Sequence, residues 1–332
     1  MQRLNNTVLS KGDKMSQTKK ITWVIAHDPA YLFIRAAKFF KDALEERVPG
    51  QIEIEVLTDT EYSEKYNNGV PVGKKDVLDL MEAGKIQVSQ LYTTWLADRY
   101  SRTLNVIDMP FLFKDHDHAA RVFDGEIGAE LLGKLESEGG EKIKALAFTY
   151  SGGYRTIPAT KAIASVEDFK GVKFRVSSGP VIKDTFDALG AETTFFPVEE
   201  LTERTLSGEV EAGECTYTRY YPLNNDKALP FINDMEHNIS CTSIIVNREF
   251  WNTLTEEQQA AMKAAGVASA KIERVESVED AVRVEAECRA NGVNVIKWDD
   301  AEVAKFKSMM TPIYDKYTTY FSDNLVNRIK NA

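Results

Sequence analysis

The N-terminal part of the chain alternates between two hydrophobic periods. Apolar positions recur at every second residue in strand-like segments, as where Ile52, Ile54 and Val56 alternate with polar residues, and about every 3.6 residues in helix-like segments. The resulting β-α-β-α-β order is typical of a parallel sheet with right-handed crossovers. The predicted elements are a strand at 21–26, a helix at 31–48, a strand at 51–57, a polar loop at 62–74, a helix at 76–83 and a strand at 86–91.

The same order of elements returns after a glycine-rich segment, Ser151-Gly-Gly-Tyr-Arg155, which we interpret as a crossing between two halves of the chain. Repetition of one α/β architecture predicts two lobes with a ligand cleft between them. The elements predicted around the crossing are a helix at 114–138, a strand at 143–150, strands at 172–176, 192–196 and 210–216, and helices at 180–189 and 198–206.

The C-terminal part is predicted to be mostly helical. Thr255 is a favourable N-cap and Gln258 stands at the capping-box position, so a helix begins here. Its amphipathic pattern continues to about residue 291, which makes it long enough to lie along both lobes. The other elements expected in this part are strands at 243–247 and 292–298 and helices within 300–329.

We divide the chain into lobe I (21–150 and 240–280), lobe II with the C-terminal helices (151–239 and 281–332) and a flexible N-terminal segment (1–20). The N-terminal segment is polar, contains four lysines and has no apolar core, so it lacks the form of an intact secretory signal peptide. Either the protein stays in the cytosol or this N-terminus replaces a removed signal. Three scattered cysteines do not fix the compartment.

Charge and hydrophobicity limit the classes of partner. The chain has 41 Lys and Arg against 51 Asp and Glu, a formal charge of −10, which argues against nucleic acid and anionic membrane surfaces. A cleft on an acidic protein can still be locally positive and hold an anion. No apolar run approaches the length of a membrane span, so we expect no direct membrane insertion.

Common catalytic and cofactor motifs are missing. The sequence contains no phosphate-binding G-x-x-x-x-G-K-[ST], no G-x-G-x-x-G after a strand, no H-E-x-x-H, no G-x-S-x-G and no C-x-x-C, so we predict no cofactor. His116 and His118 alternate with aspartates, which could suggest a metal site. Because Asp115 and Asp117 open a predicted helix, capping is the favoured interpretation.

Arg175 is the first candidate binding residue. It lies at the carboxyl end of the predicted strand 172–176, before a Ser-Ser-Gly turn and a helix that starts at Pro180. Ligands of open α/β sheets bind at this edge, and a guanidinium beside helical N–H groups suits an anion, most naturally a carboxylate. The alternative is a structural ion pair with an Asp or Glu of the protein, and the sequence leaves both open.

Further polar residues stand at similar junctions. Arg155 follows the glycine-rich crossing, and Tyr217 and Arg219 follow the strand that ends near Cys215. Cys215 could serve as a nucleophile, but no histidine is near it in sequence, and a small buried residue is the simpler interpretation.

Five segments together resemble the DctP-type solute-binding proteins of TRAP (tripartite ATP-independent periplasmic) transporters. None is specific alone, but all five occur in the family's order. The segments are Asp168-Phe-Lys-Gly-Val-Lys-Phe-Arg-Val176, Ala188-Leu-Gly-Ala191, the run from Glu199 to Gly213, Asp108-Met-Pro-Phe-Leu-Phe113 and Trp251-Asn-Thr-Leu-Thr-Glu-Glu-Gln258.

The resemblance implies a periplasmic-binding-protein-like α/β fold whose two lobes close on a small organic acid, with a long helix bridging both. Such a protein is exported, works in the periplasm as a monomer and delivers its ligand to TRAP membrane permease subunits. Alternatives are a ligand-sensing module for a receptor, or an enzyme that uses Cys215 on the same fold.

The resemblance also implies roles for residues. Arg175 would form a paired salt bridge with the ligand carboxylate, and Arg155 would contact the ligand too. The family commonly has Asn where this chain has Cys215, so either the ligand has a different second polar group or Tyr217, Arg219 or a water compensates. The other residues expected in the site are Trp95, Tyr154, His27 and Glu214.

Overall fold

The computed structural model describes residues 18–27, 31–321 and 324–332. Its strands are β1 (Lys19–Ile25), β2 (Ile52–Thr58), β3 (Val88–Tyr92), β4 (Ile143–Ala159), β5 (Lys173–Val176), β6 (Glu192–Phe195), β7 (Ala212–Gly213), β8 (Cys215–Thr216), β9 (Phe231–Asp234), β10 (Ile239–Asn247) and β11 (Asn294–Lys297). Most of the predicted flexible segment lies outside the described residues, and Lys19 and Lys20 already belong to β1.

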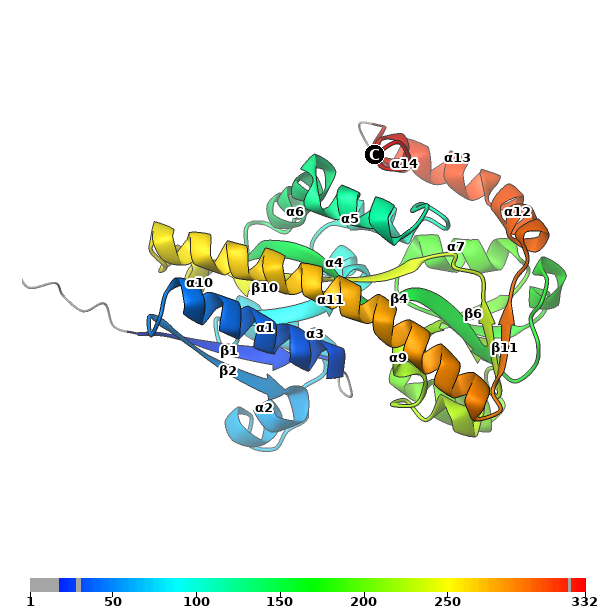
Figure 1. Cartoon of the computed structure of the whole chain (residues 1–332), viewed down its shortest axis with the longest axis horizontal. Helices are drawn as coiled ribbons and strands as arrows, with labels where there is room; N and C mark the ends of the chain where they lie inside the picture. The colour runs from blue at the N-terminus through cyan, green and yellow to red at the C-terminus, as the bar shows by residue number, and fades with distance from the viewer. Residues whose placement is uncertain (1–17, 28–30, 322–323) are drawn as a thin grey trace, which may run out of the picture.

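Helices surround these strands (Figure 1). They are α1 (Tyr31–Arg47), α2 (Asp59–Tyr66), α3 (Lys74–Glu82), α4 (Thr93–Arg99), α5 (His116–Asp124), α6 (Glu126–Glu138), α7 (Pro180–Ala188), α8 (Leu201–Leu206), α9 (Tyr217–Tyr220), α10 (Arg248–Asn252), α11 (Glu256–Ala290), α12 (Asp300–Met309), α13 (Thr311–Tyr320) and α14 (Leu325–Lys330). Short 3₁₀ turns are η1 (Arg102–Asp108), η2 (Val166–Phe169), η3 (Val198–Glu200) and η4 (Asn225–Lys227).

The sheet consists of two parallel groups joined by an antiparallel pair. Its strand order is β2-β1-β3-β10-β4-β7-β5-β6, with β8 and β9 also paired to β4, and β11 paired to β9. β1 is parallel to β2 and β3, and β5 is parallel to β6 and β7. β10 is antiparallel to both β3 and β4. The fold is therefore α/β and two-lobed, with β4 and β10 shared by both lobes.

α11 bridges the two lobes, as predicted. It packs on α1 and β4 toward its start and on α9 and β11 toward its end (Figure 1). The predicted capping box is present: Gln258 N donates to Thr255 Oγ1 over 3.2 Å, and Thr255 N donates to Gln258 Oε1 over 3.1 Å. Midway along, the buried Glu273 carboxyl accepts hydrogen bonds from Gln90 of β3 and Thr149 of β4, which ties the helix to the sheet. The residue boundaries proposed for the lobes stay a prediction.

Four local predictions differ from the structure in their details, although a crossing between the two halves at 151–155 is retained. The predicted polar loop 62–74 begins inside α2, whose capping box between Thr58 and Glu61 is the signal that pattern reading missed. The predicted helix 114–138 is two helices that meet at Gly125. The predicted strand 143–150 does not end at 150 but continues as β4 through the glycine-rich crossing to Ala159, and the predicted strand 210–216 is broken into β7 and β8 by Glu214.

Two glycines with the same left-handed backbone differ in their surroundings. Gly152 and Gly190 both have φ of +83°, but a Cβ at Gly152 would lie 2.1 Å from Thr218 Oγ1, whereas the nearest atom at Gly190 is 3.6 Å away. We expect Gly190→Ala to lower the free energy of unfolding by about 1–2 kcal/mol through backbone strain. Gly152→Ala should lower it further, because a steric clash is added. Urea unfolding of both variants measures the difference, and equal losses would contradict this explanation.

Candidate functional site

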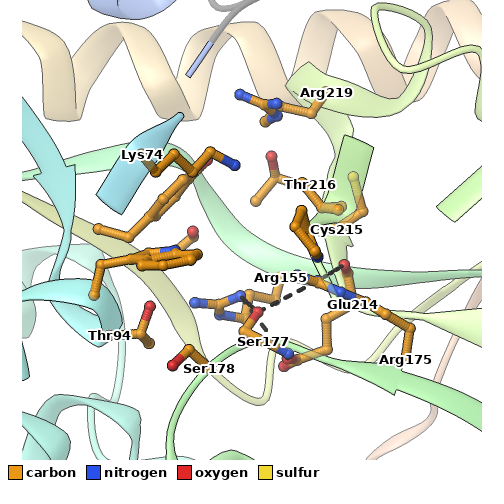
Figure 2. A pocket seen from close by; sticks show the side chains of 15 residues that line it. Lys74, Thr94, Arg155, Arg175, Ser177, Ser178, Glu214, Cys215, Thr216 and Arg219 are labelled. Carbon is orange, nitrogen blue, oxygen red and sulfur yellow. Dashed lines mark hydrogen bonds and ion pairs between the residues drawn. The ribbon is translucent and has the colours of Figure 1, made fainter. Parts of the chain in front are cut away.

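A cavity lies where the two lobes meet, at the carboxyl ends of β3 and β5 (Figure 2). This is the edge at which the sequence predicted a ligand. The lining residues are Lys74, Tyr92, Thr94 and Trp95 from the first lobe, Ser240 from β10, and Arg155, Arg175, Ser177, Ser178, Pro197, Val198, Glu214, Cys215, Thr216 and Arg219 from the second lobe.

Arg175 is buried on β5 and is held by backbone carbonyls. Its Nε donates to Phe196 O over 2.9 Å and its Nη1 to Glu214 O over 2.9 Å. Within the described residues no carboxylate oxygen lies within 4.0 Å of its guanidinium, and its Nη2 has no hydrogen-bond partner there. Burial lowers the pKa of Arg175 to about 10, although the nearby Glu214 opposes this shift. The guanidinium therefore stays charged at neutral pH without an ion-pair partner in this part of the chain.

Arg155 lies beside Arg175 and, among the described residues, differs from it in having a carboxylate within ion-pair distance. Its Nε donates to Asn238 Oδ1 over 3.0 Å, and its Nη1 donates to the Ser177 hydroxyl over 2.7 Å. Glu214 Oε2 is 3.9 Å from the same Nη1. The Ser177 hydroxyl also lies 3.5 Å from Arg175 Nη1, so this side chain stands between the two guanidiniums (Figure 2).

Glu214 supplies the negative charge at this end of the cavity. The break between β7 and β8 places its side chain inside, where it is 1% exposed. Its carboxylate accepts hydrogen bonds from Ser177 N and from His237 Nε2, each over 3.2 Å. Burial alone would raise the pKa of Glu214, but Arg155, His237 and Arg175 together lower it to about 2. One carboxylate thus faces two guanidiniums.

The other end of the cavity carries a cluster that joins the lobes. Lys74 Nζ of α3 lies 2.7 Å from both carboxylate oxygens of Glu199 in η3, and Arg219 Nη2 lies 2.9 Å from Glu199 Oε1. Burial lowers the pKa of Lys74, opposed by Glu199. Burial would raise the pKa of Glu199, but Lys74 and Arg219 lower it. Nearby, Ser178 donates to Asp98 of α4 across the same gap.

Cys215 lines the cavity as a neutral thiol. Burial raises its pKa, although Arg219 opposes the shift. Asn225 of η4, which sequence reasoning missed, donates from Nδ2 to the Cys215 sulfur over 3.6 Å. The side-chain amide that the resemblance commonly places at residue 215 is therefore absent from the cavity wall. The amide of Asn225 instead bonds to the Cys215 sulfur.

The cavity brings together six of the predicted residues, namely Arg155, Arg175, Glu214, Cys215, Arg219 and Trp95. Three other candidates lie elsewhere. The hydroxyl of Tyr217 donates to Asp234 over 3.1 Å inside the second lobe, because α9 begins at this residue and turns it inward. Tyr154 neighbours Arg155 on β4, so the two side chains point to opposite faces, and its ring packs 4.6 Å from His116.

The third misplaced candidate is His27, which lies behind the wall of the cavity. Its ring packs against Tyr92 and Phe33 at 4.3 and 5.4 Å. Burial holds its pKa well below the usual range, helped by Lys74 and Arg219, so the ring is neutral. Only its carbonyl reaches toward the site, where it accepts from Arg219 Nη1 over 3.3 Å.

The helix-capping interpretation of the His–Asp segment is confirmed. Asp115 Oδ1 accepts from His118 N over 2.6 Å at the start of α5. His118 Nδ1 accepts from Lys114 N over 3.0 Å, and its Nε2 lies 2.8 Å from Ile329 O, so the ring bonds to protein on both sides. No group of three His, Cys, Asp or Glu suited to a metal ion occurs among the described residues.

Comparison with known proteins assigns the chain. The profile of the bacterial extracellular solute-binding proteins, family 7 (DctP), matches residues 25–320. The chain belongs to this family. Among the described residues of this family 7 protein, no helix combines the length and apolar character that crossing a membrane requires.

Individual relatives are distant but match over most of their length. The C4-dicarboxylate-binding periplasmic protein DctP of Rhodobacter capsulatus is 23% identical over 90% of this chain and 86% of its own. The 2,3-diketo-L-gulonate-binding periplasmic protein YiaO of Escherichia coli is 25% identical over 79% and 76%. A TRAP periplasmic solute-binding protein of Pseudomonas putida with bound D-glucuronate has a TM-score of 0.83, 25% identity and coverage of 94% and 97%.

The depressed pKa of Glu214 predicts a pH-dependent stability difference. Because its folded pKa of about 2 lies below the unfolded value, its contribution is present above about pH 4.5 and is lost as pH falls toward 2. The difference in free energy of unfolding between wild type and Glu214→Gln should therefore be largest above pH 4.5 and shrink toward pH 2. Denaturant unfolding at stepped pH measures it. A difference that does not change with pH would contradict the assigned charge.

Proposed function

We propose that this family 7 protein captures a small organic acid through its carboxylate, outside the cytoplasm, and delivers it to the membrane subunits of a TRAP transporter. The carboxylate-binding relatives support the ligand class, and their transporter class supports the partner. In this proposal the protein acts as a monomer, carries no cofactor and catalyses no reaction.

The observation that carries the proposal is the buried charge of Arg175. Arg175 is 6% exposed as a residue, and its guanidinium faces a cavity and has no ion-pair partner within the residues that the structure describes. A buried cation without a partner is costly, and a carboxylate that accepts two parallel N–H bonds removes that cost. Arg155 stands close enough to share the same anion, and the Ser177 hydroxyl lies between the two arginines.

Lobe closure would complete the site. The contacts between Lys74 and Glu199, and between Ser178 and Asp98, join residues of the two lobes around the cavity. We infer that they form when the lobes close on the solute and break when it leaves. The shared strands β4 and β10 and the bridging helix α11 are the segments that such a hinge motion would bend.

Removal of Arg175 should abolish tight binding. We expect Arg175→Ala to weaken binding by about 2–5 kcal/mol, because the solute carboxylate loses its charged partner, which is on the order of 30- to 4000-fold in Kd. A thermal-shift screen against dicarboxylates, uronates, keto acids and sulfonates identifies a binding acid, since a ligand at a hundredfold excess over Kd stabilises the folded state by about 2.7 kcal/mol. Calorimetry with that acid then measures the loss.

Two further variants show whether a loss of affinity in Arg175→Ala is specific to its charge and geometry. Arg175→Lys keeps the charge but not the two-pronged geometry, so we expect an intermediate Kd. Arg289→Ala removes an exposed arginine that pairs with Glu285 on α11 and should bind normally. Wild-type affinity in Arg175→Ala would refute the assignment of the site.

Trp95 should report closure. It lies at the cavity, and its ring is 6.2 Å from Phe195 of the opposite lobe. We expect the binding acid to change the tryptophan emission of the wild-type protein, because the surroundings of this ring change when the lobes close. The change should vanish in Trp95→Phe and persist in Trp251→Phe, whose tryptophan lies on α10 outside the lining. A full signal from Trp95→Phe would argue against closure around this ring.

A further inference from the structure

A second cavity lies apart from the one between the lobes. The helices α5 and α11 both pack on β4, and the cavity opens between them (Figure 1). Its volume is about 370 Å³, which is within the range of small-molecule pockets. Rings and aliphatic side chains contribute to its wall, from His116 and Ala120 of α5, Tyr150 of β4, and Val275 and Val278 of α11. None of these residues lines the cavity between the lobes.

Two buried polar atoms of this wall have no hydrogen-bond partner among the described residues. They are the hydroxyl oxygen of Tyr150 and Nδ1 of His116. Tyr150 is 1% exposed, and the centres of the two rings lie 5.5 Å apart. A buried polar group that lacks a partner is costly, so both atoms mark a position for a group that the protein does not supply.

The charges at this cavity disfavour an organic anion. Three carboxylates, Asp117, Asp124 and Glu279, line it against two cations, Lys271 and Arg274. Both cations already pair with Asp124, over 3.6 Å for Lys271 and 2.7 Å for Arg274. The cavity therefore differs in charge from the one between the lobes, where buried guanidiniums lie beside too few carboxylates.

The histidine of the wall adds no charge that would attract an anion. Burial lowers the pKa of His116, although Asp115 and Asp117 oppose this shift, so the ring is neutral at neutral pH. A neutral imidazole has one nitrogen that donates and one that accepts. A hydroxyl group can do either, so it can bond to His116 Nδ1 in both tautomers and still accept from Tyr150.

We propose that this cavity binds a neutral single-ring molecule that carries a hydroxyl group, of the chemical class of the phenols. Its hydroxyl oxygen accepts from the Tyr150 hydroxyl and shares a second hydrogen bond with His116 Nδ1. Its ring packs against Val275, Val278 and the two aromatic side chains of the wall. This site is independent of Arg175 and of the organic acid.

Fluorine NMR titrations of the full chain at neutral pH test the proposal with probes of one shape. 4-Fluorophenol carries the hydroxyl group and fluorobenzene lacks it. We expect 4-fluorophenol to bind about tenfold or more tighter, as expected for two added hydrogen bonds. The anion 4-fluorobenzoate should show no binding that filling this cavity removes.

Three variants assign the binding to this cavity. Tyr150→Phe should lower the ratio of the two Kd values about threefold or more, because one hydrogen bond is lost. Removing a hydroxyl that has no partner among the described residues should leave the fold intact. Val275→Trp changes a residue that is 58% exposed, fills the cavity, and should weaken 4-fluorophenol about tenfold or more. Val282→Trp makes the same change at a valine of α11 that is 66% exposed and outside this wall, and should leave Kd unchanged.

The outcomes distinguish this proposal from the proposed function. Equal affinities of 4-fluorophenol and fluorobenzene would mean that an apolar molecule binds without the two polar atoms, and would overturn the proposal. It would also be overturned if 4-fluorophenol does not bind, if Val275→Trp leaves its Kd unchanged, or if Arg175→Ala abolishes its binding. Val275→Trp should keep the affinity for the organic acid, so either site can fail while the other stands.

Discussion

The cavity between the lobes depends on buried positive charge that exceeds the negative charge the protein places beside it. Arg155 and Arg175 are both removed from water, and Glu214 is the one carboxylate of the described residues that lies within ion-pair distance of either. Carbonyl oxygens and the Ser177 hydroxyl satisfy part of the remaining N–H groups. Isolated charges are expensive in such surroundings, so strand ends, a strand break and a turn are all positioned to limit that cost.

Much of the fold could be predicted from hydrophobic period together with capping and turn signals. β1, α1, β2 and α11 lie within a few residues of their predicted bounds, because each has a clear period and a capping or turn signal at an end. The hydrophobic pattern does not show which strands become neighbours in the sheet. The insertion of β10 between β3 and β4, and the continuity of β4 through two glycines, depend on pairing between distant segments.

The residues of the candidate site were likewise predictable only in part. Arg175 was predictable because strand, turn and helix follow one another locally, and the family resemblance pointed to Arg155. Lys74 and Glu199 were missed, because 125 residues separate them and only the packing of the lobes brings them together. Tyr154 and Tyr217 were misplaced for a simpler reason, since nearness in sequence does not fix the direction of a side chain on a strand or at the start of a helix.

The place of β10 in the sheet has a consequence for synthesis on the ribosome. The three parallel strands β2, β1 and β3 are complete early in the chain, yet the strand that covers the free edge of β3 comes after the whole middle of the second lobe. Until it emerges, the nascent first lobe exposes an unpaired edge and lacks the cover of α11. Such edges pair readily with other chains. Newly made protein therefore depends on protection from aggregation until most of its length is available.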